Sequence, residues 1–400
     1  ILHRARALGL LEGGREGLGG QGQEGSSQNG SEKEKREGRV SDGGHGSKQG
    51  NLSTVMGSLV LWIPRPRVAL FAWMLGLLGA CVAPDVLFEG DSRVSPLTAT
   101  GPAMGTEFSM VVWGPEGSGR AAALQRAFAR VRELERVLTD YDPKSEARQV
   151  TLGAGPWRPI SPILAEALAH GRALAQQTKG LVDPTVGPLT RLWRRSVRQQ
   201  SLPEPARLEQ TRRAVGFEHL EFMGNPDRMR CSVEDMRLDF GAFGKGMAID
   251  HAFEILRAAG FRSVLVDGGG DLRVGAAPPG KAGWSVGLEA HEGDQTVVLI
   301  HDRALATSGI RFQKVEIEGR VYGHIIDPRT GLGIRTPRVA TVAASTACRA
   351  DGWATALCIL GQEGLPLLPE GAEARILEVD GGEHTKYPWG TGIWGKEPAK

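Results

Sequence analysis

The chain has 400 residues and a formal net charge of +2, with 40% apolar and 24% charged residues. These proportions are typical of a soluble folded protein. The near-neutral charge lacks the basic footprint of nucleic-acid-binding proteins, so nucleic acid is excluded as a partner. Length alone would allow two or three domains. The composition of the two ends instead favours one globular unit of about 290 residues.

The first 55 residues differ sharply in composition from the rest of the chain. They are rich in Gly, Ser, Gln and charged residues, and they include the run Ser-Glu-Lys-Glu-Lys-Arg-Glu at 31–37. Such a segment buries too little apolar surface to offset the entropy lost on ordering. Residues 1–55 are therefore expected to form a disordered, low-complexity extension. The first methionine is Met56, so a start there, with 1–55 untranslated, stays open as the alternative.

Residues 56–80 have the pattern of an export signal. Arg65 and Arg67 precede a 13-residue apolar run, 68–80, which is shorter than a bilayer-spanning helix requires. The run ends in Leu-Gly-Ala-Cys, which resembles the bacterial lipobox, so Cys81 is the predicted lipidation site. Residues 81–100 would then be a tether to the membrane, on the periplasmic side of the cell envelope and with the inner membrane favoured. An ordinary signal peptide or a short membrane anchor is the alternative.

Residues 101–390 are expected to form the globular domain. Apolar side chains recur at helical spacing from Leu124 to Leu138, and Ser161 is the expected N-cap of a second helix, which Gly180 ends. The expected helices are 121–138, 162–180, 246–259 and 347–360. The expected strands are 107–113, 263–267, 284–289, 296–301, 339–344 and 375–380, with a hairpin over 314–326 that turns near Glu318-Gly319. Helices and strands mixed without a strict βαβ repeat predict the α+β class.

The cysteines of this domain are predicted to be structural. No pair of the four cysteines in the chain has the spacing of metal ligands. Cys348 and Cys358 lie ten residues apart in one expected helix, about 15 Å along its axis, which is too far for a disulfide. Cys231, Cys348 and Cys358 are therefore expected to be small buried hydrophobic residues.

The segment 350–356, Ala-Asp-Gly-Trp-Ala-Thr-Ala, is the most specific candidate site. Asp351 and Thr355 are four residues apart on the expected helix, so they share one face. A carboxylate and a hydroxyl in apolar surroundings suit a hard divalent cation such as Mg²⁺. An N-cap or surface role for Asp351 is the alternative that the residues alone leave open.

Two Gly-rich segments follow expected strands. The segment 238–246, Leu-Asp-Phe-Gly-Ala-Phe-Gly-Lys-Gly, leads into a helix, whose N-terminus favours phosphate, and Lys245 adds a positive charge. Its spacing fits neither a Walker A motif nor a Rossmann fingerprint. Three consecutive glycines, 268–270, suggest close approach of a ligand, with a permissive loop as the alternative.

His324 precedes an apolar pair and an Asp-Pro turn. A histidine in this setting is either a satisfied core residue or a general base. An imidazole suits the second role because its pKa lies near neutrality.

The order of these motifs resembles the ApbE-type FAD:protein FMN transferases. The resemblance runs from about Met104 to Gly361. It includes Met-Gly-Thr at 104–106, Tyr-Asp-Pro-Lys-Ser-Glu at 141–146, Val-Asp-Pro-Thr-Val-Gly-Pro-Leu at 182–189, Ala-Thr-Ser-Gly at 306–309 and His-Ile-Ile-Asp-Pro-Arg-Thr-Gly at 324–331, together with 238–246, the triple glycine and 350–356.

The resemblance implies a cleft that binds FAD as substrate and Mg²⁺ as cofactor. The implied metal ligands are the Asp351 carboxylate, the Thr355 hydroxyl and the Ala242 backbone carbonyl. The implied FAD contacts are Met104, Tyr141, Leu181, Val182, Asp183, Asp239, Lys245 and Ile325. Some members carry an acidic residue at the position of Lys245, so this contact departs from part of the family.

The activity implied by the resemblance is Mg²⁺-dependent transfer of FMN from FAD to a Thr or Ser hydroxyl of an acceptor protein, with release of AMP. His324 is the candidate base for that hydroxyl. The implied acceptors are flavoprotein subunits of membrane redox complexes. FAD pyrophosphate hydrolysis, with water in place of the hydroxyl, and a non-catalytic FAD-binding lipoprotein are the alternatives.

Overall fold

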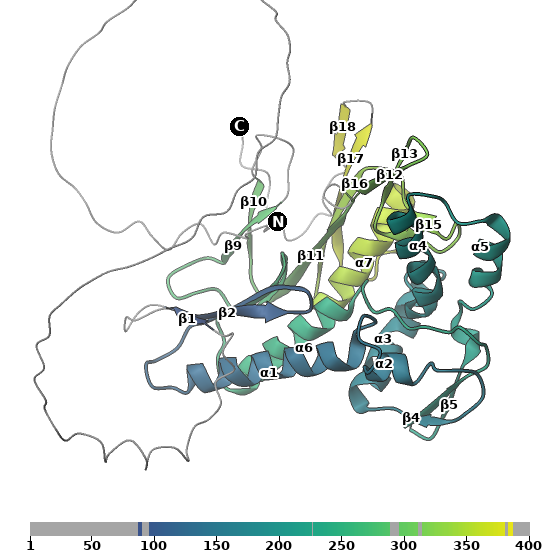
Figure 1. Cartoon of the computed structure of the whole chain (residues 1–400). Coiled ribbons are helices and arrows are strands. Elements are labelled where there is room, and N and C mark those ends of the chain that lie inside the picture. The colour runs from purple at the N-terminus through teal and green to yellow at the C-terminus, as the bar shows by residue number, and fades with distance from the viewer. Residues whose placement is uncertain are drawn as a thin grey trace, which may run out of the picture. The chain divides into compact units, whose positions relative to one another are not determined.

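The computed structural model describes residues 87–89, 96–225, 227–288, 296–310, 314–380 and 383–386 (Figure 1). The expected extension, the signal peptide and Cys81 lie outside these residues. None of the helices in the described ranges is both long and apolar enough to cross a membrane. Helices and strands are mixed as the α+β prediction requires.

The described residues include a sheet in which every strand pairs antiparallel with its neighbours. Antiparallel order accounts for the missing βαβ repeat, since neighbouring strands need no helical crossover. In spatial order its strands are β1 (Leu87–Glu89), β2 (Leu97–Ala103), β3 (Thr106–Val112), β7 (Val264–Gly268), β8 (Asp271–Val274), β11 (Arg303–Gly309), β16 (Arg338–Ala344), β17 (Glu373–Asp380) and β18 (Glu383–Lys386).

The two faces of this sheet bury different clusters. On one face, α6 (Gly244–Ala258) packs on β7 and β8, and α7 (Ala347–Leu360) packs on β11 and β16. The hairpin of β9 (Trp284–Leu288) and β10 (Thr296–Ile300) covers an apolar cluster on the other. Successive residues of β11 show the alternation, because Ala304 and Ala306 join the helical core whereas Leu305 joins the hairpin cluster.

Helices α1 (Arg120–Leu138) and α3 (Pro162–Gln177) extend the helical layer, with α1 packed on α6 and α3 in contact with both α1 and α7 (Figure 1). The buried positions of α1 include Leu124, Phe128, Val131 and Leu138, as the helical spacing predicted. Ser161 caps α3 as expected, because its Oγ accepts a hydrogen bond from the Leu164 amide at 3.3 Å.

The remaining elements lie outside the large sheet and the helices α1, α3, α6 and α7. They are α2 (Glu146–Gln149), α4 (Gly187–Gln199) and α5 (Pro205–Arg212), the small sheet β4 (Arg158–Pro159), β6 (Arg228–Cys231) and β5 (Leu220–Met223), the hairpin β12 (Lys314–Ile317) and β13 (Arg320–Gly323), and the pair β14 (Ile326–Asp327) and β15 (Leu332–Gly333). Turns of 3-10 helix occupy Pro184–Val186, Phe217–His219 and Gly361–Leu367.

Several predicted elements are confirmed, and others are new. Helix α7 has the predicted bounds, and the β12–β13 hairpin turns at Glu318 and Gly319, both with positive φ. The tether was predicted to span 81–100, but Leu87–Glu89 form β1 and β2 begins at Leu97, so these parts of the predicted tether belong to the sheet. Helices α4 and α5 were not predicted. No residue of α5 is buried, whereas α4 does bury apolar residues at helical spacing.

Helices α6 and α7 cap each other's first turn. The Asp351 Oδ2 atom, on α7, accepts a hydrogen bond from the Gly246 amide of α6 at 3.0 Å. The Asp250 carboxylate, on α6, accepts hydrogen bonds from the Ala347 and Cys348 amides of α7, both at 2.8 Å. Since the first amides of a helix have no partner within it, the two carboxylates satisfy groups that would otherwise be buried unpaired. This exchange places the starts of both helices at the same point of the fold.

Candidate functional site

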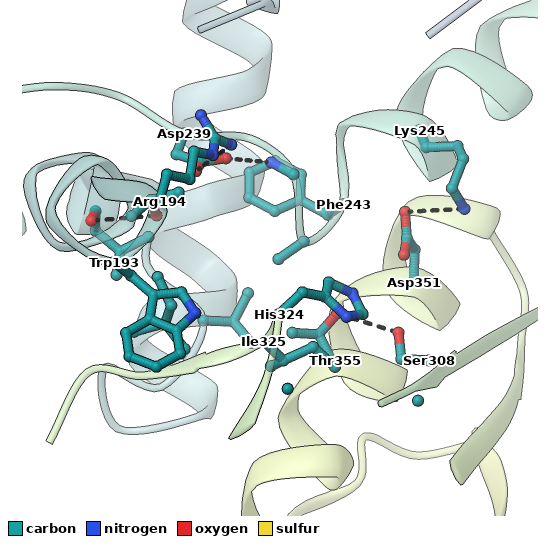
Figure 2. Close-up of a pocket in the computed structure, with 18 of the residues that line it drawn as sticks. Trp193, Arg194, Asp239, Phe243, Lys245, Ser308, His324, Ile325, Asp351 and Thr355 are labelled. Atoms are coloured by element: carbon teal, nitrogen blue, oxygen red, sulfur yellow. Dashed lines mark hydrogen bonds and ion pairs between the residues drawn. The ribbon is translucent and has the colours of Figure 1, made fainter. Parts of the chain in front are cut away.

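A cleft of about 790 Å³ opens beside the starts of α6 and α7 (Figure 2). Its wall is formed by residues from α4, α6, α7, the end of β11 and the segment between β13 and β14. All but one of the residues predicted to bind FAD or metal, or to act as base, line it: Tyr141, Leu181, Val182, Asp183, Asp239, Ala242, Lys245, His324, Ile325, Asp351 and Thr355. The cleft therefore gathers residues separated by more than 200 positions in the sequence.

Met104 is the exception. It lies in the tight turn between β2 and β3 with φ +53°, and its partly buried side chain packs against the helical core. It is absent from the residues that line the cleft. The structure thus places Met104 in a strand connection, where a two-residue turn with positive φ at Met104 and Gly105 fixes its orientation.

Asp351 and Thr355 project from one face of α7 into the cleft, as their spacing predicted. Asp351 is only 4% exposed, and Thr346 caps α7. The surface-charge alternative is therefore wrong. Of the N-cap alternative, Asp351 is not the N-cap of α7, but its carboxylate accepts a hydrogen bond from the first turn of α6. The Thr355 Oγ1 atom lies 3.3 Å from the Ser308 Oγ atom of β11, so a second hydroxyl stands beside the first (Figure 2).

Burial and nearby positive groups have opposite effects on the ionisation of Asp351. Burial raises the pKa of its carboxyl, and the Lys245 ammonium and the Gly246 amide oppose this shift. The Lys245 Nζ atom lies 3.9 Å from Asp351 Oδ2 and makes a direct ion pair with Asp271. Asp271, 3% exposed, also accepts a hydrogen bond from the Thr307 amide at 2.9 Å. Two buried carboxylates thus share one ammonium at this end of the cleft.

The donor set fits a hard divalent cation of the kind predicted. Asp351, Thr355 and the Ala242 segment all line the cleft, and they supply a carboxylate, a hydroxyl and a backbone carbonyl. Oxygen donors of these types are the ones that Mg²⁺ prefers. Within the described ranges, no three His, Cys, Asp or Glu side chains form a group that could hold a metal ion. The expected Mg²⁺ site has one carboxylate, one hydroxyl and one backbone carbonyl, so it is not a site of three His, Cys, Asp or Glu side chains.

The opposite wall of the cleft is built around Arg194 of α4. Its Nη1 atom lies 2.5 Å from Asp140 Oδ2, and its Nη2 atom lies 3.7 Å from Asp239 Oδ2. The Tyr141 ring, 77% exposed, lies over the guanidinium at 4.4 Å from ring centroid to Cζ. Burial, and then the charge of Asp140, raise the pKa of Asp239, and Arg194 opposes them. This wall therefore presents an aromatic face that a planar ring could stack on.

Asp183 organises the backbone between α3 and α4. Its Oδ1 atom accepts hydrogen bonds from the Thr185 amide at 2.8 Å and the Thr185 hydroxyl at 2.7 Å. The same hydroxyl oxygen accepts a hydrogen bond from the Gly216 amide at 2.8 Å. Burial raises the pKa of the Asp183 carboxyl. Leu181, Val182 and Asp183 consequently present a fixed edge to the cleft.

His324 and Ile325 lie between β13 and β14. The Gly323 amide donates to the Ile334 carbonyl, and the Ile334 amide donates to the Ile325 carbonyl, each at 2.8 Å. These hydrogen bonds hold the segment against Ile334. Ile325 is buried, His324 is exposed, and both line the cleft. The alternative of a buried core histidine is wrong. His324 lies between the Arg194 and Asp351 groups in the view of Figure 2.

Two of the three glycines at the end of β7 are closely packed. A Cβ atom on Gly268 would lie 2.7 Å from the Phe108 ring, and one on Gly269 would lie 2.5 Å from Thr106 Oγ1. Gly269 and Gly270 also have positive φ, and Gly269 lines the cleft. The sequence left ligand approach and a permissive loop open for this motif, and the contacts add close packing of Gly268 and Gly269 on β3.

Sequence reasoning missed several residues of the wall, among them Trp193, Arg194, Asp271 and Ser308, and it missed Asp140, which forms an ion pair with Arg194. Trp193 and Arg194 lie on the unpredicted helix α4. Leu189, Trp193 and Ser196 are buried there at helical spacing, which is the signal that could have revealed the helix. Asp271 directly follows the triple glycine and Ser308 stands within the 306–309 motif, but their spacing gave no sign that they approach Lys245 and Thr355.

Known proteins with similar sequences belong to the family that the motifs of the cleft resemble. The ApbE family model matches residues 104–376. A protein of Klebsiella pneumoniae named FAD:protein FMN transferase is 30% identical over 303 residues, which cover 72% of this chain and 86% of that protein. A protein of Escherichia coli K12 with the same name is 28% identical over 308 residues, covering 74% and 87% of the two chains.

Solved structures show the same fold. The apo form of the flavinyl transferase ApbE from Pseudomonas stutzeri superposes with a TM-score of 0.66 at 27% identity, covering 76% of this chain and 95% of that one. The flavin transferase ApbE from Vibrio cholerae gives a TM-score of 0.66 at 24% identity and covers 73% and 96% of the two chains. With the family model matching most of its length, this chain belongs to the ApbE family.

Proposed function

We propose that the chain is an enzyme that transfers FMN from FAD to a Thr or Ser hydroxyl of an acceptor protein, in a reaction that depends on Mg²⁺ and releases AMP. The main support for the proposal is the set of residues that line the cleft. It brings Asp351 and Thr355 to the Gly-rich turn at Ala242, in the same space as the FAD contacts that family resemblance implies. The names of the relatives agree with this activity.

Binding of FAD follows from the two ends of the cleft. The Tyr141 ring, supported by Arg194, offers a stacking surface for one of the two ring systems of FAD. At the other end, the N-terminus of α6 and the Lys245 ammonium offer positive charge to the pyrophosphate. Asp351, Thr355 and the Ala242 carbonyl would hold Mg²⁺ there. When bound, the ion supplies charge neutralisation for the paired phosphates.

The transfer step exchanges one P–O bond for another. The acceptor hydroxyl oxygen attacks the phosphorus of the FMN half, the bond from that phosphorus to the bridging oxygen breaks, and AMP leaves with the bridging oxygen. His324, exposed at the cleft, would take the hydroxyl proton. The residues of the cleft act mainly by positioning and charge, which are the main needs of phosphoryl transfer.

The same site would hydrolyse FAD if water reached the phosphorus in place of the hydroxyl. We therefore propose incubating the full chain with FAD and MgCl₂, with and without candidate acceptor subunits of membrane redox complexes. The expected result is an acceptor whose intact mass rises by one FMN less one water, and AMP in equal amount. FMN and AMP formed without acceptor would instead identify a pyrophosphatase.

Two controls test whether the mass shift depends on the proposed metal site. Asp351→Asn should abolish the mass shift, because it removes the only carboxylate of the expected metal site. Chelation of Mg²⁺ with EDTA should do the same to the unaltered enzyme. If the chain binds FAD but neither a mass shift nor AMP is detected with any acceptor tried, the protein is a flavin carrier and the proposed transferase activity is refuted.

We propose that Cys81 carries a lipid that anchors the enzyme on the periplasmic side of the cell envelope. The support is the apolar run 68–80 that ends in Leu-Gly-Ala-Cys. Metabolic labelling with a palmitate analogue, compared between the full chain and Cys81→Ser, tests this anchor. Equal labelling of the two proteins would refute it.

A further inference from the structure

We propose that Asp271 is a positioning residue that holds the Lys245 ammonium away from Asp351 and so leaves Asp351 available to a divalent cation. This inference rests on the proposed metal site of the transferase. It concerns a residue that the motifs did not single out as a ligand or a contact.

The geometry separates the two carboxylates by their distance from the ammonium. Lys245 Nζ is in direct contact with Asp271 Oδ2 and 3.9 Å from Asp351 Oδ2. Lys245 lies on the first turn of α6, Asp271 begins β8 and Asp351 lies on α7, so three elements converge on this point. All three side chains line the cleft (Figure 2 labels Lys245 and Asp351).

Both carboxylates are fixed by the backbone, whereas the lysine can move. The Thr307 amide donates to Asp271 Oδ1 at 2.9 Å, and the Gly246 amide donates to Asp351 Oδ2 at 3.0 Å. The Lys245 side chain, 27% exposed, has a flexible four-carbon stem. The position of the ammonium is consequently set by competition between the two carboxylates, and in this structure the ammonium lies against Asp271.

The net charge of the three side chains affects the binding of a metal ion. Counting Lys245, Asp271 and Asp351 as ionised, the three side chains carry a net charge of −1. Neutralising Asp271 would release the ammonium to Asp351 and bring the net charge to zero, so that the lysine competes with the cation for its carboxylate. Neutralising Lys245 as well would restore −1 and leave Asp351 without a competitor.

The test measures binding of Mg²⁺ alone to the full chain by titration calorimetry, without FAD. Asp271→Asn should weaken Mg²⁺ binding about tenfold, the effect of one charge at this range in a partly screened site. The Asn side chain can still accept the Thr307 hydrogen bond, so the fold should be retained. The double variant Asp271→Asn with Lys245→Met should return the affinity to within about threefold of the unaltered chain.

Glu221→Gln is the matched control. It breaks an ion pair with Arg230, whose Nη2 atom lies 2.6 Å from Glu221 Oε2 outside the cleft, and should leave Mg²⁺ binding unchanged. A purely structural role for Asp271 would leave the double variant as weak as Asp271→Asn, and that result would overturn the inference. Unchanged binding in Asp271→Asn would overturn it too.

The same titration separates this inference from the proposed function. If the unaltered chain binds no Mg²⁺, the metal site is refuted, and the inference falls with it. If the unaltered chain binds Mg²⁺ and transfers FMN but the variants do not follow the expected order, only the role of Asp271 is refuted.

Discussion

Gly246→Ala is expected to destabilise the fold at the point where α6 and α7 begin. Gly246 lies in the first turn of α6, and its amide donates to Asp351. A Cβ atom there would lie 2.3 Å from the Ala347 carbonyl oxygen and 2.8 Å from the Cys348 Cα atom. Both neighbours are backbone atoms of α7, so neither can rotate away. The two helices must separate for the methyl group to fit.

Two opposing terms set the size of the effect. Replacing Gly by Ala inside a helix favours the helix by about 0.8–1 kcal/mol. Forcing an extra methyl group into a packed interior costs about 1–3 kcal/mol, and contact with backbone lies at the upper end of that range. Separation of the helices also stretches the hydrogen bonds of the mutual caps, each worth about 1 kcal/mol. The net expectation is a loss of about 1–3 kcal/mol in the free energy of unfolding.

Urea unfolding followed by circular dichroism measures this loss as a lower midpoint at unchanged slope. Gly287→Ala is the matched control, because a Cβ atom at Gly287 on β9 meets nothing within 4 Å. That variant should unfold at or slightly above the midpoint of the unaltered chain. A midpoint for Gly246→Ala equal to that of Gly287→Ala would refute the proposed close approach of the two helices.

Three further outcomes are expected. His324→Ala should lower the rate of FMN transfer about 100-fold to 10,000-fold while FAD still binds in an equilibrium titration, because only proton acceptance is lost; transfer at the full rate would remove His324 from the mechanism. Burial raises the pKa of the Asp267 carboxyl from 3.8 to about 6. The protonated carboxyl therefore stabilises the fold below about pH 4, relative to the ionised carboxylate, and this stabilisation is lost as the pH rises through 6. Asp267→Asn should therefore raise the urea midpoint at pH 7 and leave it unchanged near pH 4, and equal gains at both values would contradict this pKa. Burial also raises the pKa of Cys231 to about 11 and of Cys358 to about 12. Peptide mass spectrometry should find both thiols unlabelled by iodoacetamide at pH 8 in the folded chain and labelled in urea.

Local patterns in the sequence predicted those elements that carry their own signals. Helix α3 has Ser161 and Pro162 at its start, and the β12–β13 hairpin has Glu318 and Gly319 at its turn. Such signals act over a few residues and need no partner elsewhere in the chain. Helix α4 has Pro188 in its first turn, but it begins directly after a 3-10 turn without a side-chain cap, and its exposed positions are mostly arginine.

The cleft was predictable mainly through family resemblance. Spacing on α7 placed Asp351 and Thr355 on one face, and nothing more local connected them to the Gly-rich turn. The hydrogen bond between Asp351 and Gly246 spans 105 positions, and the Arg194–Asp140 bond spans 54. Contacts of that range depend on the order of strands in the sheet, which periodicity does not encode. Lys245 was identified as a positive charge, but its partner Asp271 required the structure.

The carboxylate at the centre of the site also belongs to the scaffold. Asp351 accepts the hydrogen bond of an α6 amide, and Asp250 accepts hydrogen bonds from α7 amides, so the two helices and the cleft are held by the same contacts. Replacing Asp351 with Ala would remove both the proposed metal ligand and a helix cap, and loss of activity would then have two causes. The Asn side chain keeps one oxygen for the Gly246 amide, while it removes the charge and replaces the other carboxylate oxygen by an NH2 group. Asp351→Asn is for that reason the variant whose loss of transfer reports on the chemistry of the cleft.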